Sequence, residues 1–237
     1  MRVPRFFHDR LPRMPGTACS LEGDEAVHLA RVLRLRPGDE VELFDGRGGV
    51  GRFRLAEVGR RRSRLELLSR RGAAPALPFA VHCAVATPKG KRAHRLVEAL
   101  TELGAASYAP LVCARSAARP PEPETALRWA QEACKQCGRD LLPAIAPPLA
   151  AENVPARVRE HPLSLLLDPR GAVPLREALP ATPCSTLLLV GPEGGFTDAE
   201  RETFAAAGAR SVVLGPSVLR IETAAAAALA ALVAAWA

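Results

Sequence analysis

Two apolar runs near the C-terminus each end at a Gly-Pro pair, and this pattern constrains the fold more than any other feature of the chain. The first run stops at Gly191-Pro192 and the second at Gly215-Pro216. A continuous apolar run that ends at such a turn signal is typical of a strand buried in a parallel sheet. Open α/β sheets bind ligands at the carboxyl ends of their strands. The loops that follow the two runs therefore indicate a ligand site.

Strands and helices alternate from residue 79 to the end of the chain. The expected strands cover residues 79–87, 108–114, 163–168, 185–190 and 211–214. The expected helices cover residues 91–103, 125–139, 198–207 and 223–237. Such alternation predicts a parallel sheet covered by helices on both faces. The last helix is rich in alanine and too short for a bilayer span of about 20 residues, which favours a buried or interface helix and no membrane partner.

The first third of the chain is richer in short alternating strands. Residues 41–45, 50–58 and 64–69 are expected strands, and residues 24–33 are an expected helix. Several short strands joined by turns predict a small barrel. A linker is expected over residues 73–78, after which the character of the chain changes. The sequence thus predicts two domains, 1–72 and 73–237.

A glycine-rich segment at residues 46–51 matches the pattern G-x-G-x-x-G. A dinucleotide site needs a helix directly after these glycines, so that the pyrophosphate meets the helix N-terminus. The residues that follow alternate like a strand instead. The segment is therefore predicted to be a hairpin.

Positive charge is concentrated in the first 72 residues. They contain 16 Arg, no Lys and 10 acidic residues, and they account for nearly all of the net charge of +7. The planar guanidinium group binds phosphate through two hydrogen bonds, so a nucleic-acid partner is the favoured interpretation. A coding bias toward Arg is the alternative, because the whole chain has three Lys. That bias does not explain the asymmetry.

Six cysteines are spread along the chain, and Cys134 and Cys137 form a CxxC pair without a second pair to complete a zinc site. Buried thiols in a reducing compartment are the favoured interpretation, with a redox or metal role as the alternative. The first residues lack the apolar segment of a signal peptide, so a cytoplasmic protein is expected.

Arg220 lies between apolar residues in the second loop, and an unpaired arginine is costly to bury. We expect it to pair with Glu222, with Glu193 or with an anionic ligand. The glycines of the first loop lack the Lys and Ser of a P-loop, and they allow either close backbone approach to a flat ligand or simply a tight turn. Lys89 and Lys91 follow the end of a strand and face the same edge, unless they form only a solvated helix start.

The chain resembles the RsmE family, the ribosomal RNA small-subunit methyltransferase E group. The resemblance covers nearly the full length. It rests on residues 2–7, His28 with residues 31–34, residues 44–46, 89–91, 102–104 and 136–139, and most specifically on residues 191–195 and 214–224. It implies an N-terminal PUA-like barrel joined to a C-terminal SPOUT domain with a trefoil knot. It also implies a homodimer that uses S-adenosylmethionine to methylate N3 of a uridine in the 16S rRNA of the small ribosomal subunit.

Site residues are carried over from this resemblance together with the strand-end argument. Those expected to bind the cofactor are Leu189, Gly191, Glu193, Gly194, Gly195, Leu214, Gly215, Pro216, Val218 and Leu219. Those expected to contact RNA are Arg2, Arg5, Arg31, Arg34, Lys89, Lys91 and Arg139. Arg220 is expected to stabilise negative charge on a uracil oxygen, while a carboxylate or water accepts the N3 proton. Glu222 is the candidate carboxylate, and no metal is expected.

The chain departs from the family pattern at two positions. Lys135 stands where the family often has Glu, and Ser217 stands where it commonly has Arg. The second change removes one charge that is expected to contact RNA and leaves Arg220 as the arginine of that loop. Two alternatives stay open, namely a SPOUT enzyme that modifies a tRNA ribose or another base, and a non-enzymatic RNA-binding assembly factor.

Overall fold

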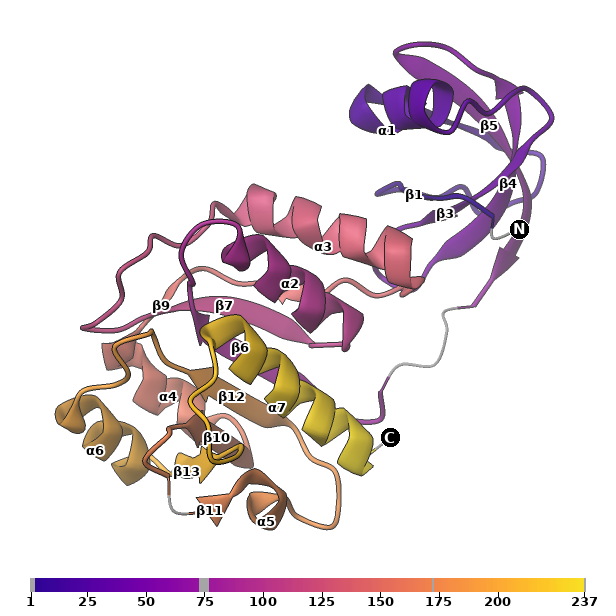
Figure 1. Cartoon of the computed structure of the whole chain (residues 1–237). Helices are drawn as coiled ribbons and strands as arrows, with labels where there is room; N and C mark the ends of the chain where they lie inside the picture. The colour runs from indigo at the N-terminus through magenta and orange to yellow at the C-terminus, as the bar shows by residue number, and fades with distance from the viewer. Residues whose placement is uncertain (1–2, 73–76, 172, 237) are drawn as a thin grey trace. The chain divides into compact units, whose positions relative to one another are not determined.

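The computed structural model describes residues 3–72, 77–171 and 173–236, which fall into two compact units (Figure 1). The first unit comprises Met1–Ala76 and Cys134–Leu142, and the second comprises Leu77–Ala133 and Pro143–Ala237. Cys134–Leu142 lies far along the chain, and the sequence pattern did not assign it to the first unit. Most of the expected linker, residues 73–76, lies outside the described residues.

A curled five-stranded sheet forms a half-barrel in the first unit. Its strands are β1 (Arg5–Phe7), β2 (Ala18–Glu22), β3 (Glu40–Phe44), β4 (Val50–Glu57) and β5 (Arg62–Arg71), in the order β1-β3-β4-β5-β2. β1 runs parallel to β3, and the other pairs are antiparallel. Alternate residues of β4 and β5 point inward, among them the fully buried Phe53 and Leu65. The antiparallel pairing of β3 with β4 confirms the predicted hairpin around the glycines.

The helix expected at residues 24–33 is split by a change of winding. α1 (Gly23–Val27) continues into a π-helical turn, His28–Val32, in which the N–H of Leu33 donates to the carbonyl of His28 at 3.0 Å. The chain leaves through Arg34 at φ +54°, a left-handed conformation that is uncommon outside glycine. Short π turns and residues in such strained conformations cluster at functional sites.

A buried ion network holds Cys134–Leu142 against the half-barrel. Asp140, whose side chain is 1% exposed, accepts hydrogen bonds from Arg5 Nη2 at 2.7 Å and from Arg71 Nη1 at 2.7 Å. Arg5 is also 3.0 Å from Glu42 and lies over the ring of Phe44. The hydrogen bond to Asp140 raises the pKa of Arg71 above its usual value. The network satisfies charges that would otherwise be costly to bury.

Lys135 contributes a further ion pair, with its Nζ 2.8 Å from Glu25 Oε1 in α1. The neighbouring CxxC pair lies on the same helix end as Lys135. The cysteines are free thiols, and a hydrogen bond with Cys137, together with burial, raises the pKa of Cys134. A thiol held in its protonated form is a poor nucleophile and metal ligand. Within the described residues, no group of three or more His, Cys, Asp or Glu side chains is arranged to hold a metal ion.

A parallel sheet forms the centre of the second unit, as predicted. Its strands are β6 (Val81–Ala86), β7 (Ser107–Val112), β8 (Ala144–Ile145), β9 (Leu149–Ala150), β10 (Leu163–Leu167), β11 (Val173–Pro174), β12 (Thr186–Val190) and β13 (Arg210–Val213). The order is β11-β13-β10-β12-β6-β7-β8, with β9 also pairing with β7, and every pairing is parallel. β10 and β12 are buried along their whole length, which explains their uninterrupted apolar sequence.

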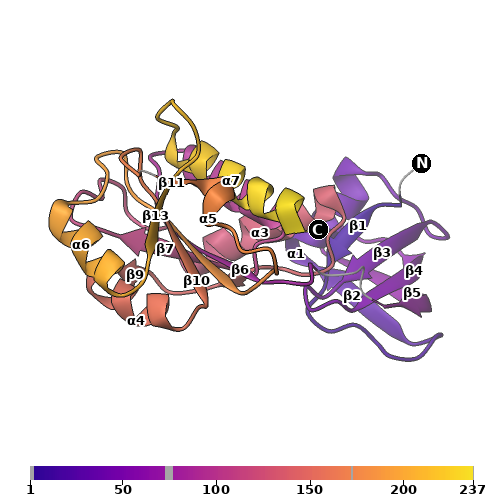
Figure 2. The same cartoon turned by 90° about the horizontal axis from the view of Figure 1, so that it is seen from below.

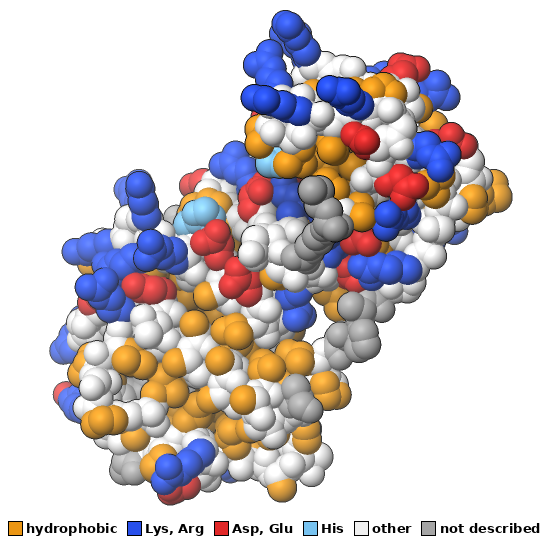
Figure 3. All heavy atoms as spheres, turned by 45° about the vertical axis from the view of Figure 1, so that its right-hand side comes forward, with side chains coloured by type: hydrophobic (Ala, Val, Ile, Leu, Met, Phe, Trp, Pro, Cys, Tyr) orange, Lys and Arg blue, Asp and Glu red, His pale blue; other side chains and the backbone are white. Residues whose placement is uncertain are grey.

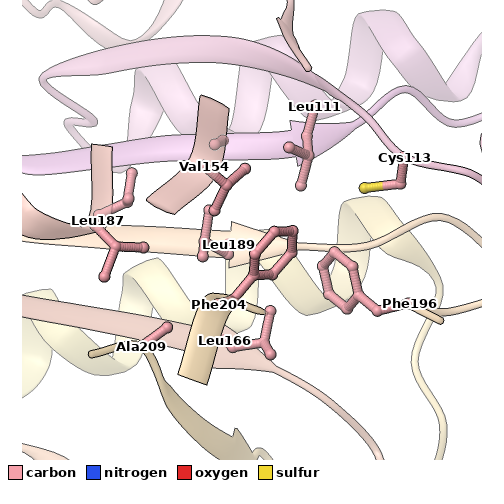
Figure 4. Close-up of a cluster of buried hydrophobic side chains, with 11 residues drawn as sticks. Leu111, Cys113, Val154, Leu166, Leu187, Leu189, Phe196, Phe204 and Ala209 are labelled. Atoms are coloured by element: carbon pink, nitrogen blue, oxygen red, sulfur yellow. The ribbon is translucent and has the colours of Figure 1, made fainter. Parts of the chain in front are cut away.

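Helices cover both faces of this sheet, which confirms the predicted layers (Figures 1 and 2). α2 (Arg92–Glu102) and α7 (Ile221–Trp236) pack together on one face, and α4 (Val154–Arg159) and α6 (Asp198–Ala206) pack on the other. Figure 4 shows the core on the α4 and α6 side, where Val154 and Phe204 meet Leu166, Leu187 and Leu189 of the strands. The remaining helices are α3 (Pro123–Cys137), α5 (Leu175–Ala178) and the short 3-10 helix Ala151–Asn153.

Every element predicted in this unit is present, and its ends agree within two residues. The short elements α4, α5, β8, β9 and β11 were not predicted, because segments of two to six residues carry too little periodicity. No helix in the described ranges has the length and hydropathy needed to cross a membrane.

We expect Asp140→Asn to lower the free energy of unfolding of the first unit by about 3 kcal/mol, because it leaves the buried Arg5 without its closest carboxylate. Urea denaturation followed by circular dichroism measures this change. Arg64→Ala is the matched control, since Arg64 pairs with Glu57 on the surface and its loss should cost less than about 1 kcal/mol. Equal effects of the two substitutions would contradict a structural role for the Asp140 network.

Candidate active site

A cavity of about 330 Å³ opens at the carboxyl ends of β10, β12 and β13. These strands are neighbours in the sheet, so the segments that follow them meet at one edge. Leu167–Pro169 comes from β10, Val190–Phe196 from β12, and Leu214–Ala224 from β13. The two loops that sequence patterning singled out therefore lie on the same cavity.

Most of the residues expected to bind a cofactor line this cavity. They are Gly191, Glu193, Gly195, Leu214, Gly215, Val218 and Leu219. Leu189 does not, because it is fully buried within β12 and packs into the core shown in Figure 4. Gly194 also lies outside the lining, as does Pro216.

Sequence reasoning missed the contribution of β10. Asp168 and Pro169 line the cavity, and the Asp168 side chain is only 6% exposed. Arg201 Nε lies 3.6 Å from the carboxylate, and the backbone N–H of Arg170 donates to it at 2.9 Å. The strand-end rule that selected the other two loops applies equally to Asp168, which directly follows an apolar run. Phe196, Ile221 and Ala224 were missed as well.

The glycine loop after β12 is held firmly in place. A Cβ on Gly191 would lie 2.8 Å from the ring of Phe196, so only glycine fits there without displacement. Arg115 Nη1 donates to the carbonyl of Gly194 at 2.9 Å, and Arg201 Nη1 donates to that of Phe196 at 2.6 Å. The loop ends in a capping box, in which Thr197 and Glu200 satisfy each other's backbone N–H groups at the start of α6.

Glu200 also ties this loop to the one after β7. Its carboxylate accepts hydrogen bonds from the N–H groups of Ala114, at 2.8 Å, and Thr197, at 2.7 Å. Burial alone would raise the pKa of Glu200, but these hydrogen bonds outweigh it and lower the pKa below its usual value. The carboxylate is thus kept ionised as a fixed anchor between two loops.

The structure contradicts the expected pairing of Arg220 with Glu222 or Glu193. Arg220 lines the cavity, yet its side chain is exposed, and within the described residues it forms no ion pair with Glu193 or Glu222. Both carboxylates pair instead with Arg92 at the start of α2, at 3.2 and 3.9 Å. Glu222 does not line the cavity. An exposed Arg220 needs no protein partner, because water solvates it.

The residues expected to contact RNA fall into three groups. Lys89, Lys91, Arg31 and Arg34 are exposed, and Figure 3 shows Lys and Arg side chains projecting from both units. The expectation that Arg5 contacts RNA was wrong, because its guanidinium is 5% exposed and pairs with Asp140 and Glu42. Arg139 is half-buried beside this network, and Arg2 lies outside the described residues.

Comparison with known proteins identifies the family. Residues 75–233 match the RNA methyltransferase domain, and residues 21–68 match the RNA methyltransferase PUA domain. Ribosomal RNA small subunit methyltransferase E of Mycobacterium tuberculosis is 34% identical over 236 residues, which cover 95% of this chain and 89% of that protein. This chain belongs to the ribosomal RNA small subunit methyltransferase E family. The Synechocystis member is 36% identical over 211 residues, with 86% of this chain and 68% of that protein covered.

Solved structures agree with this assignment. A methyltransferase of Legionella pneumophila in complex with SAM is 30% identical and superposes with a TM-score of 0.91, covering 99% of this chain and 98% of that chain. Ribosomal RNA small subunit methyltransferase E of Neisseria gonorrhoeae bound to S-adenosylmethionine is 27% identical with a TM-score of 0.88, and the same shares are covered. The half-barrel and the parallel sheet are therefore the architecture of rRNA methyltransferases of this family.

We expect Gly191→Ala to destabilise the cavity wall by about 1–3 kcal/mol, because Phe196 is 2% exposed and has little room to move away from a new methyl group. Gly215→Ala is the matched control on the opposite loop, where a Cβ meets nothing within 4 Å. Thermal denaturation of both variants measures the difference. A Gly215→Ala variant as unstable as Gly191→Ala would argue against this packing explanation.

Proposed function

We propose that this protein transfers a methyl group from S-adenosylmethionine to N3 of a uridine in the 16S rRNA of the small ribosomal subunit. The observation that carries the proposal is the cavity at the carboxyl ends of β10, β12 and β13, in a chain whose solved relatives hold S-adenosylmethionine. The family membership supports ribosomal RNA as the substrate. The position of the methylated atom comes from the resemblance to the family.

The chemistry of the cavity lining fits this cofactor. Apolar side chains such as Val190, Leu219 and Ile221 suit a flat adenine ring. Asp168 and Glu193 supply carboxylates, which suit ribose hydroxyls or an ammonium group. We propose that the backbones of residues 189–195 and 214–219 cradle the cofactor. When bound, S-adenosylmethionine supplies an electrophilic methyl group on a sulfonium centre.

The protein's own residues then have to stabilise the negative charge that develops on the uracil and make its N3 atom accessible. N3 of neutral uracil carries a proton, and its loss places negative charge on the neighbouring oxygens. Arg220, exposed at the cavity and without a carboxylate partner in the described chain, stabilises that charge. Glu222 faces Arg92 and not the cavity, so water is the proposed proton acceptor. N3 lies on the pairing edge of the base, so the nucleotide has to be flipped out or single-stranded.

A knotted C-terminus and a homodimer are further parts of the proposal. The final helix α7 packs on β6 and β12, although the preceding strand β13 lies beyond β10 in the sheet. The segment between them therefore passes the position of β10 on its way to α7, and this return supports the proposal of a threaded chain end. The outward face of α7 carries half-exposed alanines, and Figure 3 shows a broad hydrophobic area on this unit. Small apolar side chains allow a second copy to approach closely.

The first unit is proposed to hold the RNA. Arg31 and Arg34 are exposed beside a π-helical turn, next to the exposed Val32 and Leu33. Phosphate contacts of this kind fix the register of the RNA and carry no sequence information. Lys89 and Lys91 are exposed on the second unit and are proposed to contact RNA there.

The reaction is tested on small ribosomal subunits from cells that lack this protein. They are incubated with the protein and S-adenosylmethionine, and reverse transcription is read along the 16S rRNA. An N3 methyl group blocks pairing, so a new cofactor-dependent stop at one uridine is expected. Methyl label in RNA without a stop would favour ribose modification, and no label despite RNA binding would favour an assembly factor.

Arg220→Ala is expected to lower the rate of methyl transfer about 10²–10³-fold, because it removes a cation directed at developing charge. Binding of S-adenosylmethionine should change less than about threefold, since the loop backbones hold the cofactor. Single-turnover methylation and isothermal titration calorimetry measure the two quantities. Full turnover in a variant that still binds the cofactor would remove Arg220 from the mechanism.

Replacing Arg31 and Arg34 by Gln is expected to weaken RNA binding and to make its salt dependence less steep by about one ion per lost phosphate contact. Filter binding at several salt concentrations measures the slope. The Arg5→Gln variant serves as a contrast, because Arg5 is buried and its loss should reduce stability without a comparable change in slope. An unchanged slope in the Arg31 and Arg34 variant would place the RNA on another surface.

A further inference from the structure

We propose that Arg92 is a positioning residue that joins the two walls of the cofactor cavity. One wall is the glycine loop after β12, and the other is the segment that leads into α7. The proposal rests on the proposed function only in its prediction about S-adenosylmethionine binding. Its structural part concerns the cofactor-free protein.

Arg92 reaches three separate segments of the chain. Its Nη2 lies 3.2 Å from Glu193 Oε1 in the glycine loop, and its Nη1 lies 3.9 Å from Glu222 Oε2 at the start of α7. Its Nε donates to the carbonyl of Lys89 at 3.3 Å, which fixes the guanidinium against its own loop. The guanidinium directs a different nitrogen to each of these three groups, whereas an ammonium group would have to reach all of them from one nitrogen.

Glu222 depends on this arginine. Its side chain is 14% exposed, and its Oε2 is buried without a hydrogen-bond partner within the described residues. A carboxylate removed from water in this way needs a positive neighbour. Arg92 is the cation that the structure provides, so the first turn of α7 is tied to α2.

The other arginines of the glycine loop act differently. Arg115 and Arg201 donate to the backbone carbonyls of Gly194 and Phe196 and thereby fix the path of the loop. Neither of these bonds involves α7. Arg92 instead pairs with two side chains. One is Glu193, which lines the cavity, and the other is Glu222, at the base of the opposite wall. Arg92 therefore sets the spacing between the walls.

Fixed walls lower the cost of ordering the site when a ligand binds. Without Arg92, the carboxylates of Glu193 and Glu222 lose their shared cation, and the walls are free to separate. The consequence is weaker cofactor binding, with little effect on the chemical step once the cofactor is bound. This pattern is the opposite of that expected for Arg220.

The decisive experiment compares Arg92→Ala with the wild-type protein by hydrogen exchange and calorimetry. In the absence of cofactor, amides of residues 191–196 and of the first turn of α7 should exchange faster in the variant. The dissociation constant for S-adenosylmethionine should rise about tenfold, and KM should rise while kcat changes less than about threefold. Arg95→Ala is the matched control, since Arg95 is exposed on the same helix and no ion pair of the described residues involves it. It should behave like the wild type.

Two further variants separate positioning from general destabilisation. Arg92→Lys should restore binding only in part, because the single nitrogen of an ammonium group is poorly placed to reach both carboxylates and the Lys89 carbonyl at the same time. In a double-mutant cycle, Arg92→Ala should have a smaller effect in a Glu193→Gln background, where half of the bridge is already lost.

Unchanged exchange and an unchanged dissociation constant in Arg92→Ala would overturn the inference, as would simple additivity in the cycle. A wild-type protein that fails to bind S-adenosylmethionine would overturn the proposed function instead. The exchange data would then still decide whether Arg92 joins the two walls.

Discussion

The central position of β12 in the parallel sheet determines where everything else in the second unit lies. β12 pairs with β10 on one side and with β6 on the other, and it is buried along its whole length. All three strands run in the same direction, so their carboxyl ends lie at one edge of the sheet. Asp168 after β10, the glycine loop after β12 and the start of α2 after β6 therefore lie at that edge. The cavity and the Arg92 bridge are consequences of this register.

Burial separates two kinds of arginine that look alike in the sequence. Arg5 and Arg31 both belong to the arginine-rich first third of the chain. Arg5 is buried and donates a hydrogen bond to Asp140, which is 135 positions away in the sequence, whereas Arg31 is exposed on a helical turn. A count of charges therefore overstates the surface available to RNA. Part of the positive charge in this unit stabilises the docking of Cys134–Leu142 on the half-barrel.

The sequence predicted the parallel sheet and its helices well, because buried strands and amphipathic helices have strong periodic patterns. It also predicted that residues 191–195 and 214–219 would share a site, since strand ends are easy to recognise. It missed the partners of Glu193 and Glu222, which are paired by a residue about 100 or more positions earlier in the chain. Such long-range ion pairs depend on strand order, which local patterning does not provide.

The same limit explains the interpretation of Arg220. Read along the chain, Arg220 and Glu222 are neighbours, and pairing them removes an apparent burial cost. In the structure Glu222 forms its ion pair with Arg92, and Arg220 is exposed at the cavity. An arginine without a carboxylate partner keeps its full charge for a ligand, because no ion pair has to be broken before it acts. Because Arg92 from α2 pairs with both nearby acids, Arg220 carries no ion pair within the described residues and its charge can be directed at a bound ligand, as the proposed mechanism requires.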